Sequence, residues 1–169
     1  MAGKISLSKT AIIIGASSGI GRCLAKALSD RGYSLGLTAR RQSLLEQLQS
    51  ELTTPTHIQE MDVDSVAASS SQLQTLIDTL GQVDLIVISA GTGFINEDLD
   101  PSLELQTVDT NVRGFVSLAA TAFKYFESEG RGHLVGLSSI AALRGGPGAP
   151  AYNASKAFQM NYLEGLRIK

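Results

Sequence analysis

The sequence is poor in the features that mark secreted, membrane-spanning and nucleic-acid-binding proteins. Cys23 is the only cysteine among 169 residues, so no disulfide can form within the chain. The longest apolar runs, 11–14 and 85–88, are of strand length and too short to cross a bilayer. A net charge of -2 arises from scattered charges without a basic tract, which argues against nucleic acid as a partner. These absences favour a cytoplasmic protein that binds neither nucleic acid nor membrane.

Three further features carry no functional signal. Residues 1–9 contain two lysines and no long apolar stretch, so we expect no signal peptide. Cys23 stands among apolar residues of a predicted helix, where a small buried thiol is common, and we expect it to lie in the core. His57 and His133 have no partners at ligand spacing, so we predict no metal site.

Short β-branched runs alternate with longer amphipathic segments, a pattern typical of a parallel sheet covered by helices. The predicted strands are 11–14, 34–38, 57–61, 83–89 and 133–137. The predicted helices are 20–30, 44–52, 69–80, 107–126 and a last one from about Tyr152. Strands that read as continuous apolar runs are buried on both faces, which requires helices on both sides. We therefore predict one doubly wound α/β domain over residues 1–169, with a parallel sheet between two helical layers.

A glycine-rich turn follows the first predicted strand and precedes an amphipathic helix. It reads Gly15-Ala16-Ser17-Ser18-Gly19-Ile20-Gly21. Backbone N–H groups at the start of such a helix can face a pyrophosphate. The spacing G-x-x-x-G-x-G departs from the general dinucleotide fingerprint G-x-G-x-x-G. A plain tight turn would not require three glycines and two serines, so the turn predicts a nucleotide site.

The end of the second predicted strand favours NADP(H) over NAD(H). Sheets that bind NAD usually carry an acid there for the ribose 2′-hydroxyl, whereas arginine accommodates a 2′-phosphate. The segment has no carboxylate, and the guanidinium of Arg40 offers a planar fork of donors. Arg41, Ser17 and Arg22 could assist it. The alternative is that Arg40 and Arg41 only open a solvated helix.

Tyr152 and Lys156 stand four residues apart near the C-terminus and share one face of a predicted helix. A phenol has a pKa of about 10, and a neighbouring cation favours its ionised form, which suits proton transfer. Ser139 lies at the end of the fifth predicted strand, where ligands of such sheets bind. Its hydroxyl can donate to a carbonyl oxygen that gains charge during hydride transfer. We expect Ser138 to bond the backbone of its own loop.

Together these motifs resemble the ordered signature of the short-chain dehydrogenases/reductases. The residues that carry the resemblance are Gly15–Gly21, Ser89-Ala90-Gly91, Asn111, Ser139 and Tyr152–Lys156. The resemblance implies a Rossmann-like domain that transfers hydride between NADP(H) and a ketone, aldehyde or secondary alcohol, with Tyr152 as general acid or base. It implies that Lys156 lowers the pKa of Tyr152 and bonds the nicotinamide ribose. It also implies that Ser139 orients the substrate carbonyl and that Asn111 holds a water linking the lysine to solvent.

The resemblance further implies cofactor contacts and an assembly. Asp62 and Val63 match the family's adenine contact, although they could be an ordinary strand-end acid and its neighbour. Ser89 stands where the family usually has asparagine, so we expect looser cofactor packing along Ser89-Ala90-Gly91. The helices that carry the active-site residues resemble the family's dimer interface, so we expect a homodimer or homotetramer. The residues that could supply its apolar patch are Phe115, Ala119, Ala120, Phe123 and Phe158.

The sequence stops at Lys169 in mid-helix, without a glycine or proline stop signal, whereas family members normally continue. We therefore expect a C-terminally truncated form that lacks one wall of the nicotinamide and substrate pocket. One alternative is a noncatalytic protein or fragment that binds NADP(H), or that assembles with a partner supplying the missing strands. A methyltransferase is disfavoured because it needs an acid after the second strand and leaves Ser139, Tyr152 and Lys156 unexplained.

Overall fold

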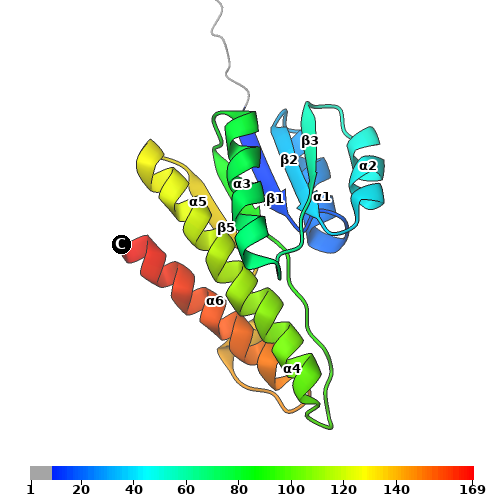
Figure 1. Ribbon diagram of the computed structural model, residues 1–169, viewed down its shortest axis with the longest axis vertical. Helices are drawn as coiled ribbons and strands as arrows, with labels where there is room; N and C mark the ends of the chain where they lie inside the picture. The colour runs from blue at the N-terminus through cyan, green and yellow to red at the C-terminus, as the bar shows by residue number, and fades with distance from the viewer. Residues whose placement is uncertain (1–8) are drawn as a thin grey trace, which may run out of the picture.

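A parallel sheet forms the centre of the computed structural model, which describes residues 9–169 (Figure 1). Its strands are β1 (Thr10–Ile14), β2 (Ser34–Ala39), β3 (Thr56–Glu60), β4 (Leu85–Ile88) and β5 (His133–Gly136). Every neighbouring pair is parallel, in the order β3-β2-β1-β4-β5. The chain begins at the central strand and builds outward in both directions, which confirms the predicted doubly wound topology. The expectation of no signal peptide rests on residues that lie outside the described range.

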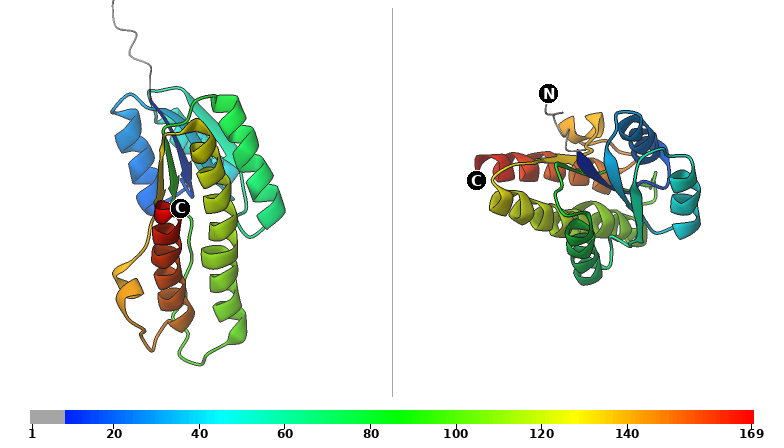
Figure 2. Two further views of the ribbon diagram at one scale, coloured as in Figure 1. Left: turned by 90° about the vertical axis from the view of Figure 1, so that its left-hand side faces the viewer. Right: turned by 90° about the horizontal axis from the view of Figure 1, so that it is seen from above.

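Helices cover both faces of the sheet. They are α1 (Gly19–Ser29), α2 (Gln42–Ser50), α3 (Val66–Leu80), α4 (Pro101–Val108), α5 (Phe115–Glu129) and α6 (Pro150–Ile168). Helices α1 and α2 pack on one face, whereas α3, α5 and α6 pack on the other (Figure 2). This packing confirms the predicted three-layer arrangement. Within residues 9–169, no helix combines the length and apolar character needed to cross a membrane.

Strand β1 separates two apolar cores because successive side chains of a strand point to opposite faces. Ile12 and Ile14 face α3 and α5, while Ala11 and Ile13 face α1 and α2, and all four are fully buried. Burying one isoleucine side chain contributes roughly 1.5–3 kcal/mol. This strand therefore fixes the position of the loop that follows it, which is the glycine-rich turn.

The helix predicted at 107–126 is part of a longer helical run, which Figure 1 shows alongside α6. The run passes from α4 through a π-helical segment, η1 (Asp109–Gly114), into α5. Its first turn carries two start signals that the prediction missed: Pro101 at the beginning, and the Asp100 carboxylate, which accepts from Ser102 N at 2.8 Å. The π-helical segment leaves no comparable trace in the hydrophobic pattern.

Gly114 lets η1 approach the loop after β3 closely. A Cβ atom at this position would lie 2.5 Å from the carbonyl oxygen of Val63. A side chain there would push the helical run away from the sheet. The glycine thus sets the distance between η1 and the carboxyl ends of the strands.

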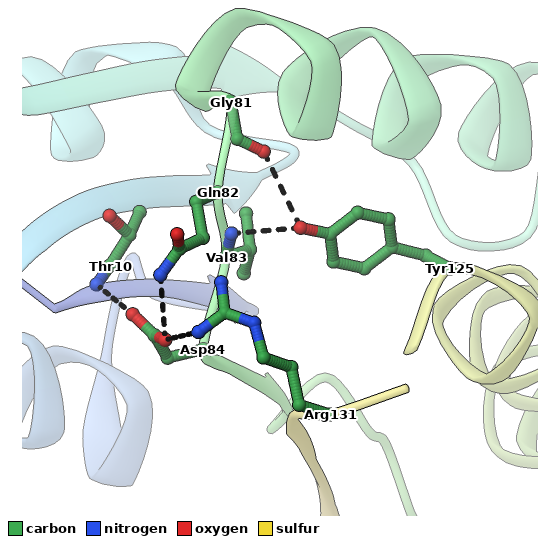
Figure 3. A network of polar contacts seen from close by, with 7 residues as sticks. All are labelled: Thr10, Gly81, Gln82, Val83, Asp84, Tyr125 and Arg131. Atoms are coloured by element: carbon green, nitrogen blue, oxygen red, sulfur yellow. Dashed lines mark hydrogen bonds and ion pairs between the residues drawn. The ribbon is translucent and has the colours of Figure 1, made fainter. Parts of the chain in front are cut away.

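At the opposite end of the sheet, one carboxylate joins three segments (Figure 3). Asp84 Oδ2 accepts from the backbone N–H of Thr10 at 2.9 Å, which ties the start of β4 to the start of β1. Its other oxygen, Oδ1, accepts from Gln82 Nε2 at 3.3 Å and from Arg131 Nη1 at 3.4 Å. Because Arg131 precedes β5, the carboxylate aligns three strands at the amino end.

Tyr125 anchors α5 to the same end of the sheet (Figure 3). Its hydroxyl accepts from the backbone N–H of Val83 at 2.9 Å and donates to the carbonyl of Gly81 at 3.4 Å. Both groups belong to the segment between α3 and β4. The polar contacts at this end therefore align secondary structure, and they leave the other end of the sheet for ligands.

Two predictions about exposure are wrong. Cys23 is exposed and not part of the core, because the buried face of α1 is formed by Gly21, Ala25, Leu28 and Ser29. Helical periodicity turns position 23 away from that face.

The proposed apolar patch for assembly is also wrong in part. Phe115 and Ala119 are 2% and 0% exposed, because they pack against the sheet in this chain's own core. Phe158 on α6 is 38% exposed and stacks on Tyr162. The members of the predicted patch that are not buried are Ala120, Phe123 and Phe158.

Gly114→Ala tests the close approach of η1 to the β3–α3 loop. The added methyl group should collide with the Val63 carbonyl and lower the free energy of unfolding by roughly 1–3 kcal/mol. Gly165→Ala is the matched control, because its Cβ would meet no atom within 4 Å and alanine is the better helix former. Urea denaturation followed by circular dichroism compares the two variants. Equal stabilities for both would contradict the proposed contact.

Candidate active site

A cleft of about 890 Å³ opens at the carboxyl ends of the strands. It extends from the glycine-rich turn after β1, past the ends of β2 and β4, to the start of α6. The residues singled out from the sequence that line it are Gly15, Ser17, Ser18, Gly19, Ile20, Arg40, Arg41, Val63, Ser89, Ala90, Gly91, Ser138, Tyr152 and Lys156. Segments far apart in the chain thus meet in one place, as expected for a sheet of this topology.

The glycine-rich turn holds its shape by backbone contacts that exclude side chains. Gly15 has a φ of 91°, and a Cβ there would lie 2.6 Å from the backbone nitrogen of Ala90. The N–H groups of Gly15 and Ala16 donate to the Thr38 carbonyl at 2.8 and 2.9 Å. At Gly21, a Cβ would collide with the carbonyl of Gly15. The first N–H groups of α1 have no side-chain cap and can therefore serve an anion.

Two arginines lie at the same end of the cleft as the turn. Arg41 Nη2 donates to the hydroxyl oxygens of Ser17 and Ser18, each at 3.1 Å. Arg40 is exposed on the cleft wall. Arg22, expected as a helper, instead forms an ion pair with Glu51 at 2.6 Å.

Lys156 is buried beside Tyr152 on the cleft-facing side of α6. Its Nζ lies 5.8 Å from the centroid of the Tyr152 ring. It donates to the Leu137 carbonyl at 2.8 Å and to Gln159 Oε1 at 3.0 Å. Burial lowers the pKa of Lys156 below its ordinary value, because the charged ammonium loses hydration.

Ser138 and Ser139 follow β5 and bond to different elements. Ser138 Oγ donates to the carbonyl of Lys156 at 3.0 Å, which joins β5 to α6. Ser139 Oγ accepts from Ala141 N at 3.2 Å and begins the 3-10 helix η2 (Ile140–Leu143). The local backbone bond expected of Ser138 therefore belongs to Ser139, which lies just outside the cleft lining. The hydroxyl proton of Ser139 is not used in this bond.

Asn111 is fully buried in η1, behind the cleft. Its Oδ1 accepts from Thr92 N at 2.9 Å, and its Nδ2 donates to Thr92 O at 2.7 Å and Ser155 Oγ at 3.0 Å. These bonds fasten the loop after β4 to α6. Its carbonyl oxygen accepts from Gln159 Nε2 at 2.8 Å.

Asp62 and Val63, the expected adenine contacts, separate in the structure. Val63 lines the cleft, whereas Asp62 borders a smaller hollow beside α2 and β3. The Oδ1 atom of Asp62 accepts from Asp64 N at 3.2 Å. Asp64 lines the cleft in its place, and its own Oδ1 is a buried atom without a hydrogen-bond partner.

Several residues of the site were missed by the sequence analysis. Glu104 on α4 accepts from Ala151 N at 2.9 Å and from Asn96 Nδ2 at 2.8 Å, and so fixes the first turn of α6. Glu104 lies in the first turn of its own helix, α4, where a carboxylate is common. Its role was not predictable because the helix that it caps, α6, is distant in sequence. Gln159 follows Lys156 by three residues, a spacing that places both on one helix face. The missed cleft-lining residues also include Thr38, Met61, Thr92, Phe94, Ile95, Thr110 and Ala149.

The doubly wound sheet, the glycine turn and the cleft beyond it define a Rossmann-like nucleotide-binding domain. The family model described as short chain dehydrogenase matches residues 9–168. The chain therefore belongs to the short-chain dehydrogenase/reductase family.

Curated relatives agree with this assignment. An uncharacterized oxidoreductase of Myxococcus xanthus is 37% identical over 166 residues, which cover 95% of this chain and 65% of the relative. Sulfoacetaldehyde reductase 2 of Chromohalobacter salexigens is 32% identical over 167 residues, 95% of this chain and 66% of the relative. The chain thus spans slightly less than two thirds of the length of these relatives.

Solved structures share the fold. An alcohol dehydrogenase from the archaeon Thermococcus sibiricus, complexed with 5-hydroxy-NADP, superposes with a TM-score of 0.89 at 26% identity, covering 95% of this chain and 71% of that one. Actinorhodin polyketide ketoreductase with NADPH gives a TM-score of 0.84 at 28% identity, covering 94% and 64%. These similarities extend over nearly all of the described residues.

Asn111→Leu tests the brace behind the cleft. Leucine has a similar size but leaves the N–H and C=O groups of Thr92 unpaired, so the free energy of unfolding should fall by roughly 2–4 kcal/mol. Asn161→Leu on the exposed side of α6 is the control and should change it by less than about 0.5 kcal/mol. Denaturant unfolding measures both. A small effect at position 111 would show that the Thr92 loop does not depend on this side chain.

Proposed function

We propose that the protein is an NADP(H)-dependent oxidoreductase that transfers hydride between nicotinamide and a carbonyl compound or secondary alcohol. The observation that carries this proposal is the position of Tyr152 and buried Lys156 on the wall of the same cleft that starts at the glycine turn. A phosphate-binding turn and an acid–base pair in one cleft suit a bound dinucleotide with a reacting carbonyl at its far end.

The groups around the turn fit a dinucleotide with a 2′-phosphate. The uncapped N–H groups of α1 suit the pyrophosphate, and the space beside Gly15 admits no side chain. Arg40 stands exposed next to Arg41, which is already held by Ser17 and Ser18, so two cations meet at the place of the 2′-phosphate. Two structural neighbours are complexes with NADPH and with 5-hydroxy-NADP, which supports the same cofactor here.

The far end of the cleft suits proton transfer. When bound, the nicotinamide supplies or accepts the hydride. In the reducing direction, Tyr152 gives its phenolic proton to the carbonyl oxygen, and the Lys156 ammonium favours the phenolate that results. Lys156 has a third N–H that meets no acceptor within residues 9–169, and this group can bind a ribose hydroxyl. Ser139 directly follows the cleft-lining Ser138, and its hydroxyl proton, which the bond with Ala141 N does not use, would donate to the same carbonyl oxygen.

The proposal also includes the location and the assembly of the protein. We infer a cytoplasmic enzyme that forms a homodimer or homotetramer through α5 and α6; on α6, Phe158 and Met160 are exposed. The alternative is a noncatalytic NADP(H)-binding protein. Turnover by the unsubstituted protein separates the two functions, since both would bind NADP(H) and only the oxidoreductase would consume it.

Tyr152→Phe should abolish turnover and leave NADPH affinity within about twofold, because only the acid–base hydroxyl is lost. Tyr162→Phe, on the same helix but outside the cleft lining, should keep both. NADPH oxidation is followed across a panel of ketones and aldehydes in the protein that carries this chain. Retained turnover in Tyr152→Phe would exclude the assigned role. Tight binding without turnover in the unsubstituted protein would favour the noncatalytic alternative.

Arg40→Asp should weaken NADPH binding by about tenfold or more and improve NADH binding, because a carboxylate repels a 2′-phosphate and can accept from a 2′-hydroxyl. Arg31→Asp introduces the same charge change at an exposed arginine that donates to the Ala27 carbonyl, far from the turn. Fluorescence titration with each cofactor gives the dissociation constants. The same NADPH affinity in both variants would remove Arg40 from the site.

A further inference from the structure

The side chain of Gln159 connects the proposed acid–base group to the π-helical segment. Its Oε1 accepts from Lys156 Nζ at 3.0 Å, and its Nε2 donates to the carbonyl oxygen of Asn111 at 2.8 Å. Gln159 is 1% exposed, Lys156 is 6% exposed and Asn111 is fully buried. The three residues form one buried chain of hydrogen bonds between α6 and η1.

The orientation of the Gln159 amide is determined by its two partners. An ammonium can only donate, and a backbone carbonyl can only accept. Reversing the amide would place its NH₂ group against Lys156 and its oxygen against the Asn111 carbonyl. Only the observed orientation satisfies both contacts, so Gln159 presents a fixed acceptor to the lysine.

The Asn111 carbonyl that accepts this bond lies in the π-helical segment. Such segments are rare and alter the hydrogen-bond register within a helical run, often at functional sites. The Asn111 carbonyl, which lies in η1, bonds a side chain 48 residues away in the chain. The same residue also holds Thr92 through its side chain. Asn111 therefore organises the cleft wall with its side chain and Gln159 with its backbone.

We propose that Gln159 is a positioning residue that holds Lys156 Nζ at the floor of the cleft and supports its charge. This inference rests on the proposed function for its catalytic meaning, but the contact itself does not. The Nζ group is held from two sides, by Gln159 and by the Leu137 carbonyl. Its free N–H can then serve the cofactor side of the cleft, where Gly91 leaves space. A Cβ at Gly91 would lie 3.3 Å from Nζ.

Gln159 adds a direct connection between Asn111 and Lys156 to the water contact that the resemblance implies. The Asn111 carbonyl accepts from Gln159 Nε2, and Gln159 Oε1 accepts from Lys156 Nζ. A carbonyl oxygen has two lone pairs, so this contact leaves one lone pair of the Asn111 carbonyl for a water.

Few titratable or charged groups lie close enough to Lys156 to affect its protonation. Tyr152 on α6 is the titratable side chain that faces it. The groups brought against it by the end of β5 and by η1 are uncharged: the Leu137 carbonyl and, through Gln159, the Asn111 carbonyl. The carboxylates of packed elements bond elsewhere, Asp109 on η1 to Arg113 and Glu104 on α4 to Ala151 N. Burial lowers the pKa of Lys156, so an acceptor at Gln159 Oε1 opposes that shift.

Titration of Lys156 by NMR, in the chain without cofactor, tests the proposal directly. The Nζ and Cε resonances of labelled lysine are assigned by their loss in Lys156→Met. Gln159→Met keeps the length of the side chain but removes the acceptor, so the pKa of Lys156 should fall further, by about one unit. Gln159→Glu places a carboxylate at the same atom and should raise the pKa by about one unit or more. Gln106→Met, an exposed glutamine on α4, is the control and should leave it unchanged.

A Lys156 pKa that is the same in Gln159→Met and the unsubstituted chain would overturn the proposal. Circular dichroism shows whether each variant folds, and if Gln159→Met does not, the sign of the shift in Gln159→Glu decides. Failure of the oxidoreductase proposal gives a different result. In that case the unsubstituted protein would not bind NADPH or would not turn over carbonyl compounds, while the lysine titrations would still follow the substitutions at position 159.

Discussion

The cleft depends on the burial of one polar side chain, Asn111, within a π-helical turn. Its side-chain amide bonds both backbone groups of Thr92 and the hydroxyl of Ser155. Its backbone carbonyl accepts a hydrogen bond from Gln159. Each buried polar group left without a partner costs roughly 1–3 kcal/mol, so loss of the Asn111 side chain would leave several groups unpaired at once. The loop after β4, the π-helical segment and α6 are consequently held as one wall.

Burial of a cation is the second constraint on the site. Lys156 loses hydration, which lowers its pKa, and it recovers part of the lost interaction from the Leu137 carbonyl and the Gln159 amide. Both acceptors are neutral dipoles held by other bonds. In the proposed reaction, the ammonium would act on the phenol of Tyr152 without a salt bridge that cancels its charge.

The sequence predicted the order of strands and helices and the position of the glycine turn, because hydrophobic periodicity and glycine spacing are local properties. Predictions from the sequence were less successful where the burial or bonding of a side chain depends on residues far away in the chain. Cys23 looked apolar in context but lies on the outer face of α1, and Phe115 looked like a surface residue but packs against the sheet. Ser138 and Ser139 are neighbours of the same residue type, but they meet different partners. Ser138 donates to the Lys156 carbonyl on α6, whereas Ser139 accepts from Ala141 N in the next turn.

By itself the sequence determined the doubly wound sheet, the glycine-rich turn and the pairing of Tyr152 with Lys156 on one helix face, since each follows from spacing along a regular backbone. Only the tertiary structure decided how Lys156 is held, because its two acceptors come from the end of β5 and from Gln159, which is itself fixed by a carbonyl of the π-helical segment. A side-chain amide becomes part of such a site only when folding closes the distance to a backbone oxygen 48 residues away. No pattern of neighbouring residues encodes that distance.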